Sequence, residues 1–440
     1  MRVFFIFHPR FLRWQHNISL LFHFLFLFQN QSLEETEMDK NSFTAPPLKG
    51  IKVLELGSLI AGPYAGSLLA QFGADVIKIE PPGKGDPLRR WRQLHKDTSL
   101  WWRVQSRNKR SIALDLRQPE GQDIARELAL QSDIVIENFR PGVLERWGLG
   151  WETLHALNPR LIMVRVSGYG QDGPYHRRPG FAAIAECMGG LRYGTGYPDR
   201  PPVRAGVSLG DTLASLYGTI GALLAMHHLH QSGGQGQMID VALYESVFAI
   251  MESLIPDYQL NGHQRERTGA SLPGIAPSNT YPTGDGKWVV IAANSDAIFI
   301  RLMQAMGRPD LASDPRLSDN AGRVEHSAML DQTIGDWTGA RSLTDVLTAL
   351  EQAEVPSGSI YTAADILNDP HYQARGMLEK HTLEDGQELT IPGIVPKLSR
   401  SPGATQWLGP ELGEHTDSIL QELGMSPERC RTLREQGIVE

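Results

Sequence analysis

The chain contains little cysteine: two residues, Cys187 and Cys430, in a length of 440. Two cysteines cannot build a disulfide framework or a thiolate metal cluster, which is typical of a protein from a reducing compartment. Positive charge is not in excess, because 42 lysines and arginines face 50 acidic residues, for a formal net charge of −8. Nucleic acid and anionic membranes attract basic chains, so we expect neither as a partner. We expect a cytoplasmic protein, or a mitochondrial one if the source is a eukaryote.

Several catalytic motifs are also missing. The sequence has no Gly-x-Ser-x-Gly turn and no P-loop, which argues against a serine hydrolase and a nucleoside triphosphatase. His227, His228 and His230 crowd one helix end, but they lack the spacing and the glutamate of a zinc-binding helix. We therefore predict no metal site. The glycines of residues 57–66 do not have the dinucleotide-binding spacing, so they give little support for NAD.

The first segment differs from the rest of the chain. Residues 18–28 are strongly apolar but shorter than the roughly 20 residues that a transmembrane helix needs. We expect residues 1–47 to be an N-terminal extension outside the fold, with Met38 as the true start. A targeting presequence and a secretory signal remain as alternatives.

From Leu48 onward, apolar strand patterns alternate with amphipathic helices. The first unit is strand, helix, strand, which is the beginning of a parallel sheet with a ligand crevice at the strand ends. This alternation predicts an α/β fold. After residue 245 the pattern changes toward loops and helices, which predicts a smaller second domain. The strands are predicted at residues 51–56, 76–80, 112–116, 133–137 and 159–166, and the first helices at 64–72 and 119–131.

A stretch of small residues, 204–211, leads into a long helical pattern. Residues 212–230 contain no proline and carry one apolar stripe of an amphipathic helix. Asp211 stands just before the stripe, where we expect it to cap the helix and meet the positive end of its dipole. The stripe consists of Leu213, Leu216, Tyr217, Ile220, Leu223, Leu224 and His227.

Polar residues at strand ends are further candidates. Arg107, Lys109 and Arg110 precede a strand, where they could bind phosphate or form a solvated rim. Asn138 and Arg146 follow a strand, on the side where open α/β sheets bind ligands. Each of these two could also have a structural role.

Several short motifs follow one another in order along the chain. They include Gly-Ala-Asp-Val-Ile-Lys-Ile-Glu at 73–80, Asn-Lys-Arg-Ser at 108–111, Glu-Asn-Phe-Arg-Pro-Gly at 137–142 and Gly-Asp at 210–211. Together they resemble the family III CoA-transferases, the group named for carnitine and bile-acid enzymes. The resemblance extends from Leu48 to the C-terminus. Other members of the set lie at residues 48–56, 61–63, 82–86, 168–170, 236–237 and 413–416.

The resemblance implies a Rossmann-like large domain built from both ends of the chain, a smaller α+β domain, and a homodimer of interlocked rings. The large domain would comprise residues 48–245 and 356–440, with linkers and the small domain at 246–355. The implied activity moves CoA from an acyl-CoA donor to a small carboxylic acid, with acyl-CoA as a substrate and no tightly bound cofactor.

The resemblance also implies roles for individual residues. Asp211 would be the catalytic nucleophile. Ile60 and Ala61 would line the acyl site, Asn108, Lys109 and Arg110 would lie along bound CoA, and Asn138 and Arg146 would help to hold it.

The substrate is less well defined. The family member that acts on oxalate has a glutamine at the position of Ile60 and a run of glycines as a lid, where this chain has only residues 269–274. Oxalate is therefore not expected. Arg204, close to Asp211, either indicates a dicarboxylate such as succinate or braces the loop.

The implied chemistry suits an aspartate. With a pKa near its ordinary value of about 3.9, Asp211 would be ionised at pH 7 and would need no separate base. Its attack on a thioester would give a mixed anhydride, and the released CoA thiolate would then give an aspartyl-CoA thioester. Backbone N–H groups at glycine turns and at the helix start could stabilise the oxyanions.

Two alternatives remain: an α-methylacyl-CoA racemase and a non-catalytic CoA-binding protein. The racemases share these motifs. In them the aspartate at the position of Asp211 acts together with a histidine, and a second aspartate directly follows that histidine. Racemisation needs two acid–base groups on opposite faces of one carbon. Here Phe181 and Ala182 stand at the racemase positions, and His176 is several residues out of register.

Overall fold

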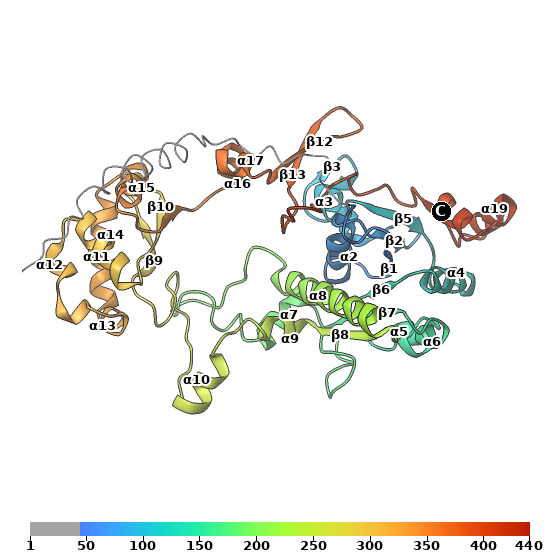
Figure 1. The fold of residues 1–440 in the computed structure, drawn as a ribbon, viewed down its shortest axis with the longest axis horizontal. Coiled ribbons are helices and arrows are strands. Elements are labelled where there is room, and N and C mark those ends of the chain that lie inside the picture. The colour runs from blue at the N-terminus through green and yellow to red at the C-terminus, as the bar shows by residue number, and fades with distance from the viewer. Residues whose placement is uncertain (1–44) are drawn as a thin grey trace, which may run out of the picture.

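The computed structural model describes residues 45–440. The predicted extension at 1–47, with its alternatives, lies almost entirely outside the described residues. Figure 1 shows two lobes joined by two separate connecting segments, so that the described chain closes into a ring. The larger lobe contains a six-stranded sheet, and the smaller lobe contains a three-stranded sheet with a group of helices.

The larger lobe is built on a parallel sheet with the strand order β5-β2-β1-β6-β7-β8. Every neighbouring pair of strands in it is parallel. The predicted α/β fold with a parallel sheet is therefore confirmed. The six strands are β1 (Lys52–Glu55), β2 (Asp75–Glu80), β5 (Lys109–Ala113), β6 (Ile134–Glu137), β7 (Ile162–Ser167) and β8 (Met238–Ala242).

Helices cover both faces of this sheet, each with its own apolar core. On one face α2 (Ala61–Gln71) and α8 (Leu209–Ser232) pack against the central strands. On the other face α4 (Pro119–Leu130) and α6 (Trp151–Leu157) pack together with α18 (Thr416–Glu422) and α19 (Pro427–Glu435). Because both faces are covered, the strands bury apolar side chains on both sides, as parallel strands usually do. Several charged residues within the strands, such as Lys78 and Lys109, are buried as well and pair with carboxylates.

Helix α8 turns its small side chains, not its large ones, toward the sheet. A methyl group added at Gly218 would lie 3.1 Å from Val164 Cγ1, and one at Gly221 would lie 2.7 Å from Ile239 Cγ2. Only small residues allow this close packing. The predicted stripe does not face the core: Ile220 is 51% exposed and Leu224 63% exposed. By length and composition α8 could span a membrane, but here one face of it packs on the sheet.

The smaller lobe has an independent apolar core. The antiparallel strands β9 (Ser278–Pro282), β10 (Trp288–Ala292) and β11 (Ser357–Ser359) form its sheet. Phe299, Leu330, Ile334 and Leu350 are among the fully buried residues between this sheet and its helices. The helices are α11 (Asp296–Ala305), α12 (Pro309–Ala312), α13 (Asn320–Glu325), α14 (Ser327–Gly339) and α15 (Leu343–Gln352), with a 3-10 turn at Pro315–Leu317.

After the smaller lobe the chain returns to the first sheet. The N–H of His415 donates to the carbonyl of Ser111 on β5 (3.0 Å), and the N–H of Asp115 donates to the carbonyl of Ile438 (2.8 Å). The C-terminal segment therefore covers the β5 edge of the sheet. The returning segment contains α16 (Ala363–Asn368), α17 (Pro370–Ala374) and the hairpin of β12 (Leu378–Thr382) and β13 (Glu388–Pro392).

The carboxyl ends of β1 and β6 lie side by side at the centre of the sheet. From β1 the connection runs outward to β2, and from β6 it runs the other way to β7. In open α/β sheets, ligands bind in the crevice at such a point of reversal.

The remaining elements in the larger lobe and the connections are a 3-10 turn at Pro87–Arg90, β3 (Leu94–His95), β4 (Thr98–Ser99), α3 (Leu100–Gln105), α5 (Val143–Arg146), α7 (Ala182–Met188), α9 (Leu243–Phe248) and α10 (Leu254–Asn261).

Candidate active site

A cavity of about 690 Å³ lies at the carboxyl ends of the central strands. The loop after β1 supplies Ser58 and Ile60 to its wall, and the loop after β6 supplies Asn138. Asp211, in the first turn of α8, faces the same space. The volume of this cavity is within the range of sites that hold small molecules. The structure therefore brings the residues predicted at the acyl site together with Asp211.

Asp211 is the third residue of α8, and the cap position belongs to Ser208. The prediction that Asp211 caps the helix is wrong, because the helix begins two residues before it. The carboxylate still lies at the positive end of the helix dipole. One turn later, the Ser215 hydroxyl donates to the carbonyl of Asp211 (2.8 Å) and to the carbonyl of Ala61 on α2 (2.7 Å). This hydroxyl ties the first turn of α8 to the first turn of α2.

The ionisation of Asp211 differs from the sequence-based expectation. Burial raises the pKa of Asp211 to about 6; Arg204 acts to lower it, and Glu186 adds to the rise. The expected pKa near 3.9 is therefore wrong, since the carboxylate is removed from much of the solvent. With a pKa of about 6, roughly ten ionised carboxylates exist for each protonated one at pH 7. Most Asp211 side chains are therefore ionised near neutral pH.

The cavity wall is strongly cationic. Arg92, Arg140, Arg178 and Arg204 line it, and within residues 45–440 its one acidic lining residue is Asp211. Arg178 stacks on the ring of Tyr175, outside the lining, with 3.6 Å between the guanidinium carbon and the ring centroid. Guanidinium groups bind carboxylates through paired hydrogen bonds. The cavity therefore suits an anionic substrate.

Asn138 lines the cavity and also braces its wall. Its Oδ1 accepts from the N–H of Ser58 (2.9 Å), and its Nδ2 donates to the carbonyl of Ser58 (2.8 Å). A methyl group at Gly57 would lie 2.5 Å from Asn138 Oδ1. The loop after β1 can approach Asn138 this closely only because glycine is present there.

A second cavity, of about 610 Å³, adjoins the first. Both are lined by Ser58, Trp91 and Phe139. The second crosses the carboxyl ends of β1, β2 and β5, and its wall combines apolar side chains with basic residues. Arg146 is exposed on α5, directly before Trp147, which lines this cavity. The other apolar lining residues include Leu56, Ile79, Leu114 and Leu116, and the basic ones are Lys84, Arg90 and Arg117.

Sequence reasoning missed Trp147, Arg90 and Arg117 as candidates. A usable signal was present, because Arg117 follows β5 and Trp147 follows α5 beyond β6. Residues that follow parallel strands gather at the same edge of the sheet.

Asn108, Lys109 and Arg110 lie at the opposite edge of the sheet. They stand at the beginning of β5, whereas both cavities lie at the carboxyl ends of the strands. Lys109 is fully buried; its Nζ lies 2.8 Å from Glu55 Oε2 and donates to the carbonyl of Pro63 (2.6 Å). Burial lowers the pKa of Lys109.

Asn108 and Arg110 have structural partners at this edge too. Asn108 is buried, and its Oδ1 accepts from the N–H of Gln406 (2.7 Å). Arg110 pairs with Asp75 and Glu422, each at 2.7 Å. The contacts of Asn108, Lys109 and Arg110 therefore brace the sheet at the amino ends of its strands, away from the two cavities, and their predicted placement along CoA stays a prediction.

The residues that bear on racemisation also lie at the first cavity. Phe181, 68% exposed, and Ala182 line it, so no acid–base group stands at the racemase positions. His176 lines the cavity as well, with its Nδ1 2.7 Å from the carbonyl oxygen of Gly173. Among the described residues, no group of three or more histidine, cysteine or acidic side chains is arranged to hold a metal ion.

The chain is similar to known proteins over most of its length. A sequence profile described as CoA-transferase family III matches residues 48–416. A succinyl-CoA–D-citramalate CoA-transferase of Chloroflexus aurantiacus is 52% identical over 395 residues, which cover 89% of this chain and 98% of the relative. The beta subunit of a succinyl-CoA–L-malate CoA-transferase from the same organism is 45% identical over 401 residues, covering 90% and 99% of the two chains. The crystal structure of a CAIB/BAIF family protein from Brucella suis matches with a TM-score of 0.76 and 35% identity, covering 86% of this chain and 100% of that one.

Proposed function

Because the chain belongs to CoA-transferase family III, we propose that it transfers CoA between two dicarboxylic acids, with Asp211 as the residue that carries CoA between them. One observation carries this proposal: four arginines share a cavity of about 690 Å³ with a single aspartate. A dicarboxylic acyl group has a free carboxylate in addition to its thioester. An arginine of the wall can bind that free carboxylate while Asp211 reacts with the thioester carbon.

The reaction needs no external acid or base. The Asp211 carboxylate attacks the thioester carbon of the donor, the C–S bond breaks, and CoA leaves as a thiolate, which gives a mixed anhydride. The thiolate then attacks the Asp211 carbonyl, releasing the first acid and forming an aspartyl-CoA thioester. The acceptor carboxylate attacks this thioester and expels the CoA thiolate, which gives a second mixed anhydride between the acceptor and Asp211. The thiolate then attacks the acyl carbon of the acceptor, the anhydride C–O bond to Asp211 breaks, and the new acyl-CoA forms. Asp211 is then a carboxylate again.

The second cavity is the proposed place for the rest of CoA. Its apolar wall suits an adenine ring, and Lys84, Arg90 and Arg117 suit the phosphates. The shared residues Ser58, Trp91 and Phe139 connect this cavity to the one that contains Asp211. A pantetheine chain that passes them would bring its sulfur toward Asp211. Asn138 and the exposed Arg146 flank this route from α5 and the loop before it.

The exposed face of α8 supports a homodimer. Its large apolar side chains, with Leu224 63% and Ile220 51% exposed, have no core to cover them in the single described chain. A contiguous apolar surface of this kind is typical of a protein–protein interface. The two lobes and their connecting segments close into a ring, which is the form expected of a subunit in an interlocked dimer (Figure 1). The strand order is also the one expected for a Rossmann-like sheet.

A racemase is the weaker candidate. Its support is the position of His176 at the cavity wall. Against it, Phe181 and Ala182 offer no acid–base group, and the two relatives named above are CoA-transferases.

A panel of acids tests the proposed substrate class. Acyl-CoA donors and acceptors of equal chain length, one set with a second carboxylate and one without, are compared by kcat/KM. We expect dicarboxylates to react about 10- to 100-fold faster, since a charge-assisted hydrogen bond contributes about 1.5–3 kcal/mol. Arg204→Met should lower kcat/KM for dicarboxylates more than for monocarboxylates. If monocarboxylates react faster than every dicarboxylate, the proposed class is wrong.

A further inference from the structure

The loop that enters the active site contains a leucine in an unusual backbone conformation. Leu59, between β1 and α2, has φ of 66°, the left-handed region that glycine adopts easily and leucine rarely does. Such conformations persist only when the surrounding structure holds them, and they are frequent at active sites. The contacts that hold Leu59 therefore bear on catalysis.

Two buried side chains hold the two polar backbone groups of Leu59. Both carboxylate oxygens of Asp86 accept from the N–H of Leu59, each at 3.1 Å. The Gln105 side chain donates from Nε2 to the carbonyl of Leu59 at 2.6 Å. Asp86 is 1% exposed and Gln105 is 4% exposed. The conformation of Leu59 is thus fixed from both sides by groups that water does not reach.

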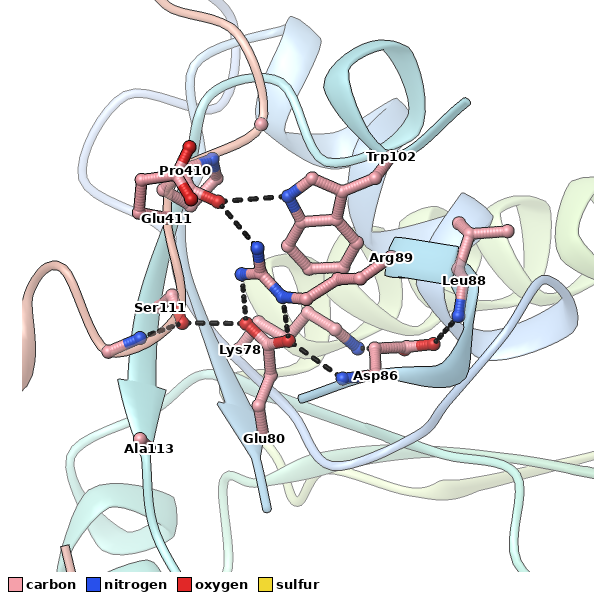
Figure 2. A network of polar contacts seen from close by, with 12 residues as sticks. Lys78, Glu80, Asp86, Leu88, Arg89, Trp102, Ser111, Ala113, Pro410 and Glu411 are labelled. Carbon is pink, nitrogen blue, oxygen red and sulfur yellow. Dashed lines mark hydrogen bonds and ion pairs between the residues drawn. The ribbon is translucent and has the colours of Figure 1, made fainter. Parts of the chain in front are cut away.

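Asp86 is itself fixed by a buried polar network. Figure 2 shows its N–H bonded to a Glu80 oxygen (2.9 Å) and its carboxylate bonded to the N–H of Leu88 (2.8 Å). Lys78 Nζ lies 2.9 Å from Asp86 Oδ2 and donates to the carbonyl of Gly57, also at 2.9 Å. Burial opposes ionisation, but Lys78 and the N–H donors outweigh it, so the pKa of Asp86 is lowered. A charged carboxylate is therefore maintained beneath the loop.

The chain after Leu59 forms part of the active site. Ile60 occupies the cap position of α2, Ala61 is its first residue, and both line the cavity with Asp211. N–H groups in the first turn of a helix have no acceptor within the helix. N–H groups held in place beforehand at a developing oxyanion are among the strongest contributions to acyl transfer.

We propose that Asp86 and Gln105 are positioning residues, which hold Leu59 in its left-handed conformation and so aim the first N–H groups of α2 at the carbonyl oxygen of the reacting thioester. This inference deepens the proposed function and rests on it. Gln105 lies outside both cavities, and Asp86, which borders the second cavity, directs its buried carboxylate at the N–H of Leu59, so both act through the backbone of Leu59.

The substitution Gln105→Met tests this inference in three backgrounds: wild type, Leu59→Ala and Leu59→Gly. Leu59→Ala and Leu59→Gly both remove the leucine side chain. They differ only in that alanine keeps a β-carbon, which makes φ above zero unfavourable. We expect Gln105→Met to lower kcat by at least about 10-fold in the wild-type and Leu59→Ala backgrounds, with the KM for acyl-CoA changed less than about 3-fold. In Leu59→Gly the same substitution should lower kcat by less than about 3-fold, because glycine keeps the conformation unaided.

A matched control and a second measurement accompany this test. Gln71→Met, at a second buried glutamine at the end of α2, should leave kcat within about 3-fold of wild type. The unfolding temperature of the Leu59 variants can be measured without an activity assay. Leu59→Gly should unfold at a higher temperature than Leu59→Ala.

Two outcomes would overturn the inference. One is an equal loss of kcat from Gln105→Met in the Leu59→Gly and Leu59→Ala backgrounds. The other, which is decisive even if Gln105→Met fails to fold, is a higher unfolding temperature for Leu59→Ala than for Leu59→Gly. Failure of the proposed function would look different, since Asp211→Ala would then keep the wild-type rate whatever residue stands at position 59.

Discussion

The raised pKa of Asp211 predicts a reaction that is sensitive to pH just below neutrality. With a pKa of about 6, roughly 90% of the carboxylate is ionised at pH 7 and roughly 9% at pH 5. Under the proposed mechanism only the carboxylate attacks the thioester, so kcat/KM should fall about 10-fold between these two pH values. An aspartate with an ordinary pKa near 3.9 would stay more than roughly 90% ionised at pH 5, and the rate would hardly change.

Two substitutions should move this profile in opposite directions. Glu186 is fully buried, with Oε2 2.8 Å from Arg192 Nε and 3.9 Å from Arg204 Nε. Because Glu186 raises the pKa of Asp211, Glu186→Gln should move the midpoint of kcat/KM to lower pH. Because Arg204 lowers this pKa, Arg204→Met should move the midpoint to higher pH.

Stability gives a second measurement of the same shift. The ionised Asp211 is unfavourable in the folded state, so Asp211→Asn should stabilise the protein at pH 7. The rise from 3.8 to about 6 corresponds to roughly 3 kcal/mol, which solvent at the partly exposed carboxylate reduces to about 1–2 kcal/mol. The folded pKa lies above the unfolded one, so the destabilisation is complete above about pH 6 and disappears as the pH falls toward 4.

The assay is kcat/KM between pH 4.5 and 8, with thermal unfolding of wild type and Asp211→Asn at pH 7 and pH 4.5. The explanation that Asp211, with a raised pKa, sets the pH dependence of the reaction is refuted if kcat/KM is flat down to pH 5. It is also refuted if Asp211→Asn brings no more stability at pH 7 than at pH 4.5.

Two further predictions follow from the cavity and from α8. An acyl-CoA with a chiral 2-methyl group, incubated in deuterated water without an acceptor acid, should gain no deuterium at a catalytic rate, because Phe181 and Ala182 offer no second acid–base group. Catalytic exchange that disappears in Asp211→Asn would instead favour a racemase. Leu224→Glu should abolish the proposed homodimer in sedimentation, whereas Leu157→Glu, at a 55% exposed site on α6, should leave it intact. A wild-type monomer with full activity at micromolar concentration would contradict the proposed assembly.

The sheet could be predicted from the sequence because each strand is a short apolar run between recognisable turns. The predicted positions agree within one residue with β1, β2 and β6, and β7 begins three residues later than expected. β5 begins three residues earlier than expected. That difference arises because Lys109 and Arg110 are polar but pair with buried or neighbouring carboxylates within the strand. An apolar pattern gives no sign of such pairing.

The orientation of α8 could not be predicted from its pattern. Large apolar residues at helical spacing normally face the core. Here Gly218 and Ala222 face the sheet, because larger side chains would collide with the strands, and Leu224 is left exposed. The sequence cannot distinguish a core from the surface of a second subunit.

The site was predicted in part. Ile60, Ala61, Asn138 and Asp211 all line one cavity, since they follow strands that end at the same edge or begin the helix beside it. The residues at 108–110 were placed along CoA by the resemblance, and the basic pattern before a strand gave no information about what their side chains contact. The contacts that fix Leu59 were also beyond prediction, because Asp86 and Gln105 reach it from distant parts of the chain.

The central claim is that Asp211 forms a covalent bond to CoA. The most direct test incubates the enzyme with acyl-CoA, traps the intermediate with hydroxylamine or borohydride, and locates the modification by mass spectrometry of peptides. We predict a single modified residue, Asp211, and a loss of kcat of at least about 1,000-fold in Asp211→Ala, as expected when a nucleophile is removed. Modification of a different residue, or CoA transfer by Asp211→Ala at the wild-type rate, would contradict the claim.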